Sequence, residues 1–176
     1  MKGLVIGFLL GVLLLTGGGY YYFASGMAPA AASDPPMPFE KKMANMALDA
    51  HIKKEPVGQP AVPADEQNFI GGANVYKAEC SVCHGLPGQR SEYAAGMYPP
   101  PPQLFPGKGV SDDPVSETYW KVVNGIRLTG MPAFKNTLSD TQSWQVSQFL
   151  AHSNELPDSV SKLLASDAPG TKTSPK

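Results

Sequence analysis

The feature that most constrains this chain is a run of five residues near its middle, Cys80-Ser81-Val82-Cys83-His84. The two cysteines are the only ones among the 176 residues, and with two residues between them they are poor partners for a bridge that staples a fold. Two thiols at this spacing can each add across one of two neighbouring vinyl groups of a haem, which leaves the next imidazole beneath the iron. The pattern C-x-x-C-H is therefore typical of c-type haem attachment, with Cys80 and Cys83 as thioethers and His84 as an iron ligand.

Other uses of a paired cysteine motif fit the surrounding sequence less well. A thioredoxin-like dithiol follows a strand and opens a helix at its first cysteine, whereas here a helix is expected before Cys80 and a Gly- and Pro-rich stretch after the motif. A zinc site needs further ligands at short spacing, and the only other histidines are His51 and His152. We expect His152 to be a surface residue and His51 to lie outside the domain. The motif therefore favours one covalently bound haem c with its iron.

An apolar stretch near the N-terminus, residues 4–23, is about long enough to cross a bilayer as a helix. It is either a cleaved signal peptide, with a processing site at residues 30–32, or an uncleaved signal anchor. The aromatic residues 20–23 favour the anchor, because such side chains suit a membrane interface. Lys2 precedes the stretch and the next basic residue is Lys41, so the positive-inside rule predicts that the chain after the stretch lies outside the cytoplasm. We expect a single-pass protein of a bacterial cytoplasmic (inner) membrane, with its haem domain on the periplasmic side.

The composition changes along the chain and predicts four parts. The 18 Gly and 18 Pro residues indicate that much of the chain is loop and linker. Within the linker, residues 39–54 carry apolar side chains at helical spacing and predict an amphipathic helix. That helix either docks on a membrane or partner or packs on the protein's own domain. The parts are a signal anchor or signal peptide at 1–24, a Pro- and Ala-rich linker at 25–64, a cytochrome-like globular domain at 65–157, and a short helix with a disordered tail at 158–176.

The globular domain is predicted to be all-α, because it shows neither strand-like alternation nor an internal repeat. Between the cysteine motif and the second helix, residues 86–110 are Pro-rich and lack a helical pattern, so they are expected either to be functional or to wrap around another group. Helices are predicted around residues 69–76, from Asp113-Pro114 to Asn124-Gly125, from the Ser139 and Gln142 capping box to about His152, and at residues 158–165.

A second iron ligand decides between an electron carrier and a haem that binds outside molecules. The best candidate is Met131, because a methionine between Gly130 and Pro132 in a loop can be aimed inward, whereas a core-filling methionine is expected on a helix face. Met97 is the rival candidate.

Five features in register over residues 65–157 resemble class I c-type cytochromes. These are a helix with Gly72 and Tyr76, the motif C-S-V-C-H-G, a P-P-x-L loop at residues 101–104, the run N-G-I-R-L-T-G-M-P-A-F at residues 124–134, and a capped final helix with a tryptophan. The resemblance implies an all-α class I cytochrome c fold, with about three to four helices around one covalent haem, preceded here by the transmembrane helix and linker.

The resemblance also implies roles for further residues. The first and last helices would cross where Gly72 and Tyr76 meet the face that bears Trp144 or Phe149. The carbonyl of Pro102, with Pro101 as the alternative, would accept a hydrogen bond from Nδ1 of the haem histidine. Arg127 is a candidate for contact with a haem propionate.

The resemblance implies electron transfer rather than enzymatic catalysis, and the charge of the chain limits the kinds of partner. The chain has a formal net charge of -1, and residues 65–157 carry six basic against nine acidic side chains, a net of -3. This excludes a basic surface for nucleic acid, and the basic docking ring of mitochondrial cytochrome c is absent. The expected partners are redox proteins of a respiratory or similar chain, such as a quinol-oxidising complex, an oxidase or a dehydrogenase, with no small-molecule substrate. A fixed haem subunit of a larger membrane oxidoreductase is the alternative, or a sensor or catalyst if Met131 does not bind iron.

Overall fold

The computed structural model of the protein describes residues 1–105 and 113–166. The chain divides into two compact units, Met1–Asn45 and Met46–Lys176, and each is described by itself. Every regular element in the described ranges is a helix, so the prediction of an all-α fold is confirmed.

The first unit begins with α1 (Lys2–Ala24), an apolar helix with no buried side chain. At 1.5 Å per residue, 23 residues extend about 34 Å, which matches a hydrocarbon core of about 30 Å. By length and composition this helix can cross a membrane, although a signal sequence passes the same test. Beyond α1 the chain forms local turns; for example, the Asp34 carboxylate accepts the backbone N–H groups of Ala30 and Ala31, both at 2.9 Å. Helix α2 (Glu40–Lys54) begins in this unit and ends in the second.

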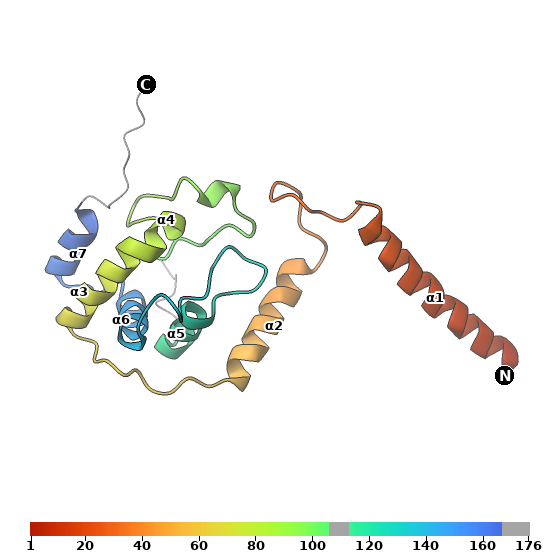
Figure 1. Ribbon diagram of the computed structural model, residues 1–176, viewed down its shortest axis with the longest axis horizontal. Helices are drawn as coiled ribbons and strands as arrows, with labels where there is room; N and C mark the ends of the chain where they lie inside the picture. Colours follow the sequence, from red (N-terminus) through yellow and green to blue (C-terminus); the bar gives the residue numbers. More distant parts are fainter. Residues whose placement is uncertain (106–112, 167–176) are drawn as a thin grey trace, which may run out of the picture. The chain divides into compact units, whose positions relative to one another are not determined.

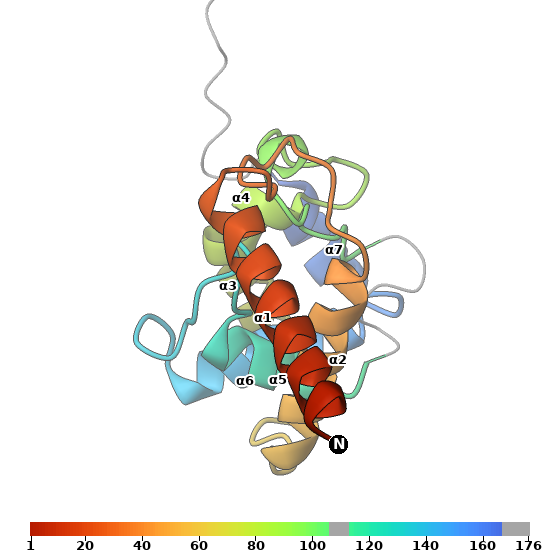
Figure 2. The same ribbon diagram turned by 90° about the vertical axis from the view of Figure 1, so that its right-hand side faces the viewer.

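The second unit gathers its longer helices side by side, as both views show (Figures 1 and 2). Helix α6 packs against α3 and α5, and α7 packs against α3. The elements are α3 (Glu66–Val75), the π turn η1 (Tyr76–Cys80), α4 (Ser81–His84), the 3₁₀ turn η2 (Ala94–Gly96), α5 (Val115–Asn124), α6 (Asp140–Ala151) and α7 (Asp158–Ala165).

The helices α3 and α6 cross at Gly72, where their backbones come unusually close. A Cβ on Gly72 would lie 2.3 Å from the carbonyl oxygen of Gln145 and 2.6 Å from the Cβ of Phe149. Only glycine permits this approach. Tyr76 is fully buried beside the crossing, with its ring centroid 5.8 Å from that of Phe149. Phe149 rather than Trp144 is thus the aromatic residue that meets Gly72 and Tyr76.

The helix ends follow local sequence signals. The Asp65 side chain accepts the N–H of Asn68 at the start of α3, and Ser139 forms a capping box with Gln142 at the start of α6. These caps satisfy backbone donors that a helix leaves unpaired in its first turn. Helix α5 ends at Gly125, whose positive φ of 68° suits glycine. Trp144 of α6 stacks on Tyr119 of α5, with centroids 3.9 Å apart.

Helix α7 completes the core of the second unit. Val160 and Leu164 have 0% and 3% exposure and belong to the same apolar cluster as Tyr76. The Lys77 ammonium donates to the carbonyl oxygen of Leu163 at 2.9 Å, which satisfies an acceptor near the end of α7. The disordered tail is predicted from Ser166 onward, and its residues 167–176 lie outside the described residues.

The segment that precedes α3 also contacts the helices of the second unit. Trp120 of α5 donates its indole N–H to the Glu55 carboxylate at 3.1 Å, and the His51 ring lies edge-on to the same indole at 5.6 Å between centroids. Gln148 of α6 donates to the carbonyl oxygen of Val62 at 3.0 Å. The end of α2 and part of the following linker are therefore held on the outer side of α5 and α6.

Candidate functional site

The cysteine motif lies at the end of a nearly continuous helical stretch. Helix α3 widens into the π turn η1 and then tightens into the single turn α4, which ends at Gly85 with a φ of 75°. Such π turns occur often at functional sites. Ser81 donates its hydroxyl to the carbonyl oxygen of Lys77 at 2.8 Å and so secures the joint between the two turns. The motif's two thiols and its imidazole are thereby set by one rigid element.

Both cysteines are unpaired and half-buried. Burial, together with the nearby charges of Glu79 and Cys83, raises the pKa of the Cys80 thiol to about 12. A thiol with so high a pKa is not the thiolate that disulfide exchange or metal binding needs. In addition, no group of three or more His, Cys, Asp and Glu residues in the described ranges could hold a metal ion. The raised pKa of Cys80 disfavours a thioredoxin-like dithiol, and no set of zinc ligands accompanies the motif among the described residues.

His84 is oriented by a carbonyl group from the following loop. Its Nδ1 lies 2.9 Å from the carbonyl oxygen of Pro102, and because a carbonyl only accepts, Nδ1–H donates. This tautomer leaves the Nε2 lone pair free for a metal. Burial lowers the pKa of His84, and the weaker effect of the Pro102 bond opposes it. His84 is therefore a neutral imidazole aimed by its own hydrogen bond.

The loop that carries Pro102, residues 86–105, is here called the proline loop. Residues 106–112, which include the rest of the predicted Pro-rich stretch, lie outside the described residues. Gly85 immediately precedes the loop, and a Cβ there would lie 2.3 Å from the carbonyl oxygen of Gln89. The buried Tyr76 hydroxyl donates to the Gly85 carbonyl at 2.7 Å. At its far end Leu104 is buried, and Phe105 packs edge-on to Tyr76 at 4.9 Å. Both ends of the loop are thus fixed on Tyr76, which places Pro102 beside His84.

Met131 lies in a second loop, residues 125–134, here called the methionine loop. The N–H of Ile126 donates to the Met131 carbonyl at 3.2 Å, which closes the loop across its neck. The Met131 N–H donates to Oγ1 of Thr129 at 3.1 Å, and that hydroxyl donates to the Ile126 carbonyl at 2.7 Å. The Met131 side chain is half-buried and packs on the apolar core, while Arg127 in the same loop is exposed. The loop therefore turns Met131 inward and Arg127 outward.

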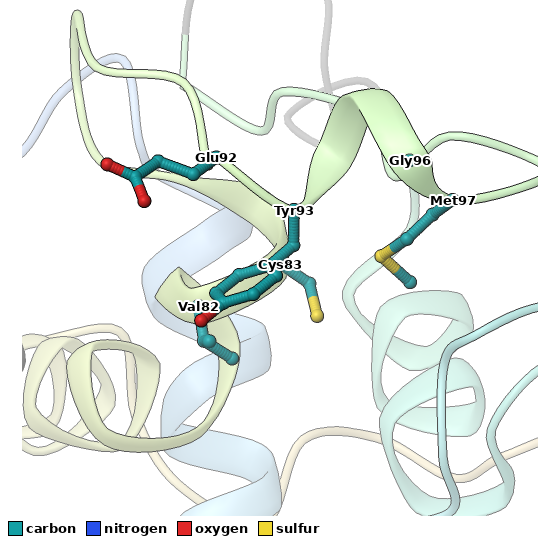
Figure 3. Close-up of a pocket in the computed structure, with 6 residues that line it drawn as sticks. All are labelled: Val82, Cys83, Glu92, Tyr93, Gly96 and Met97. Atoms are coloured by element: carbon teal, nitrogen blue, oxygen red, sulfur yellow. The ribbon is translucent and has the colours of Figure 1, made fainter.

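An open hollow of about 510 Å³ adjoins the cysteine motif. Val82 and Cys83 border it on one side, and Tyr93, Gly96 and Met97 of the proline loop border it on the other. In Figure 3 the sulfur atoms of Cys83 and Met97 both project into this space. Tyr93 and Glu92, a further lining residue, could not be predicted as part of the site, because an irregular loop carries no periodic pattern from which its contacts can be derived.

The structure brings together some of the sequence-predicted site residues. Cys80, Cys83 and His84 share one helix end, and Pro102 contacts His84 directly. His152 lies elsewhere, with Nδ1 2.9 Å from the Gln148 carbonyl oxygen at the end of α6. Two unpaired thiols beside a neutral imidazole with a free nitrogen are a donor set that fits a covalently attached haem.

Residues 67–150 match the family model described as cytochrome C oxidase, cbb3-type, subunit III. No curated protein matches the chain. A solved structure, the Kuenenia stuttgartiensis reducing HAO-like protein complex Kustc0457/Kustc0458, is similar with 23% identity and a TM-score of 0.43 over 57% of this chain. The match covers 52% of that chain, about half its length.

The all-helical fold, the site and the family match agree on a cytochrome c domain in the globular part of the chain, as its sequence motifs predict. Such a domain binds haem c covalently and transfers electrons.

Proposed function

We propose that this chain is a membrane-anchored, single-haem electron carrier in which His84 and Met131 are the axial ligands of the iron. The observation that carries the proposal is the 2.9 Å contact between Nδ1 of His84 and the carbonyl of Pro102, which orients the imidazole beside two unpaired cysteines. The half-buried Met131, held by the closed methionine loop, supplies the second ligand. Haem c supplies the one-electron Fe(III)/Fe(II) couple when it is bound.

Each residue of the site has a defined part in this proposal. Cys80 and Cys83 hold the porphyrin covalently, so it stays in place through every redox cycle. Pro102 keeps His84 in one tautomer and one ring orientation, which strengthens it as a ligand. Met131 excludes outside ligands and raises the reduction potential, as thioether ligands do. Arg127 is the candidate partner of a propionate, because its guanidinium is exposed within the same loop as Met131.

The proposed partners are redox proteins that dock at the edge of the attachment motif. Val82 lies between the two cysteines and is 54% exposed, so a partner can reach the attachment motif there. Redox encounters use small interfaces, commonly below about 1,200 Å². The excess of acidic over basic residues in the domain favours a partner surface that is not itself strongly acidic. A quinol-oxidising complex, an oxidase or a dehydrogenase of a respiratory or similar chain would meet this description.

The first helix is proposed to anchor the protein in a bacterial inner membrane, with the haem domain on the periplasmic side. Its length and apolar composition support a single membrane span. We propose the domain boundaries given by the sequence, 1–24 for the anchor, 25–64 for the linker and 65–157 for the cytochrome domain, with α7 as an added part of its core.

A second candidate function is that of a fixed haem subunit in a larger membrane oxidoreductase. The observation that favours it is the matched family model, which is described as an oxidase subunit. In either case the haem domain carries electrons; what differs is whether it leaves its partner between turnovers.

Purification from native membranes tests both parts of the proposal. The protein should resist extraction by high salt or alkali, whereas an N-terminus near Ser33 would show cleavage and contradict the anchor. On a denaturing gel it should retain one haem per chain. After solubilisation in mild detergent, a free carrier should separate from other haem proteins, and stoichiometric co-purification with oxidase subunits would replace it by the fixed-subunit alternative.

A further inference from the structure

Met97 contacts the residue that precedes the proposed ligand Met131. A Cβ placed on Gly130 would lie 2.2 Å from Cε of Met97 and 4.0 Å from its Sδ, and apart from Gly130 and its two chain neighbours no other atom of the described residues lies within 4 Å of it. The methyl group of Met97 therefore occupies the space in which a side chain at Gly130 would begin. The contact joins the proline loop, which follows His84, to the methionine loop, which follows α5.

The hydrogen bonds that hold the methionine loop come from the loop itself and from α5. Ile126 and Thr129 bond within the methionine loop, and the N–H of Phe134 donates to the carbonyl of Val122 in α5 at 3.1 Å. These bonds hold the neck of the loop and leave Gly130 exposed at its tip. Met97 approaches this tip from the opposite loop and is itself half-buried.

Met97 also borders the hollow beside Cys83, where its sulfur faces the motif (Figure 3). One side chain thus lies between the attachment motif and the tip of the methionine loop. A methionine suits this position because its unbranched thioether chain adapts to an irregular gap.

We propose that Met97 is a positioning residue that holds the methionine loop in place and so keeps the thioether of Met131 on the iron. Its contact slows the exchange of that ligand for outside molecules. The proposal rests on the ligation by His84 and Met131 proposed above. A thioether is a weak ligand of ferric iron, so an outside ligand binds when the loop opens. The rate of that binding reports how tightly the loop is held.

The test uses the complete haem-loaded protein in mild detergent, in its parent, Met97→Ala and Met97→Leu forms. The rate at which imidazole binds the ferric protein is measured by stopped flow, together with the weak near-red band of sulfur ligation to ferric iron. Met97→Ala should accelerate imidazole binding by about tenfold, which corresponds to about 1.4 kcal/mol in the opening equilibrium. It should also retain the near-red band, because Met131 still binds. Met97→Leu restores the apolar volume without sulfur and should lie within about twofold of the parent, since volume-conserving exchanges are tolerated best.

Gly130→Ala provides a second variant that acts on the same contact from the other side. The φ of Gly130 lies outside the left-handed region, so alanine is compatible with its backbone, and its new Cβ must displace the Met97 methyl. Gly130→Ala should also accelerate binding, and the double variant with Met97→Ala should be no faster than Met97→Ala alone. Such non-additivity is the signature of a shared contact.

Three kinds of result would overturn the proposed role of Met97. Unchanged binding in Met97→Ala, or strictly additive effects with Gly130→Ala, would show that the contact does not hold the loop. Loss of the near-red band in both Met97→Ala and Met97→Leu would make the sulfur of Met97 the ligand instead. A parent protein that lacks the band and binds imidazole at once would refute the proposed ligation itself, and this outcome is distinct from the other two.

Discussion

The helical frame of the haem domain, made of α3, α6 and α7, differs sharply from the two irregular loops of the site, the proline loop and the methionine loop. At the α3 and α6 crossing, Ala73, Tyr76, Val146 and Phe149 have no exposed surface. Full burial of a side chain such as Val146 or Phe149 contributes about 1.5–3 kcal/mol, so the frame is stabilised by the chain's own residues.

The proline loop and the methionine loop are ordered in another way. Pro102 and Arg127 are exposed and Met131 is half-buried. Their order comes from individual backbone bonds, such as Ile126 to Met131, and from contacts at their ends. The comparison teaches that close packing specifies the frame, whereas individual bonds hold the loops, and we propose that the haem supplies the loops' remaining contacts. The predictions below separate these two kinds of support.

The largest effect is expected when the covalent link is removed. A Cys80→Ser, Cys83→Ser double variant should carry no haem on a denaturing gel, because no thioether can form. Hydrogen exchange should then show complete loss of protection in the two loops, with residual protection confined to α3 and α6. Single Cys80→Ser should retain some haem through Cys83. Equal loss of protection in the frame and the loops would contradict the proposed difference between them.

The next largest effect is expected at the crossing itself. Gly72→Ala drives a Cβ against the Gln145 backbone and should destabilise the protein by about 3 kcal/mol, the upper range for overpacking. The matched control is Gly71→Ala, whose Cβ would have as its nearest neighbours the atoms of the flexible side-chain amide of Gln145, at 2.8 Å. Denaturant unfolding of the haem-loaded protein measures both. Equal costs for the two substitutions would show that the close backbone approach does not limit the frame.

A smaller effect is expected where the frame and the proline loop meet. Tyr76→Phe removes the buried hydroxyl that donates to the Gly85 carbonyl, leaving that acceptor unpaired at a cost of about 2 kcal/mol. Hydrogen exchange of backbone amides should accelerate more in the proline loop than in α6. A uniform acceleration throughout the domain would mean that Tyr76 supports only the core.

The smallest effect concerns Tyr119, which donates to Asp140 at the start of α6. This hydrogen bond, followed by burial, raises the pKa of Tyr119 to about 12 from its usual 10.0. Because the folded pKa is the higher one, the bond stabilises the protein fully below pH 10, and its contribution is lost as the pH rises through 12. Absorbance of tyrosinate should show one late-titrating group that Tyr119→Phe removes. An unchanged titration curve in that variant would rule out Tyr119 as the group.

The frame was largely predictable from sequence because its signals are local. The Ser139 and Gln142 capping box and the glycine at 125 mark helix ends by their own chemistry, and Gly72 marks a close approach. The contact between Met97 and Gly130 could not be predicted, since it joins two irregular loops that are distant in sequence. The same holds for Glu55 on Trp120, because a Pro-rich linker carries no pattern that reveals what it packs against.

The role of Met131 is the central claim, and binding of carbon monoxide by the reduced protein tests it most directly. With His84 and Met131 both bound, the parent should not bind carbon monoxide, whereas Met131→Ala should bind it and should lose the near-red band in the oxidised state. Met97→Ala, as the control, should keep the band and remain closed to carbon monoxide at equilibrium. Ready binding by the parent would contradict the ligation and favour a sensor or catalyst over an electron carrier.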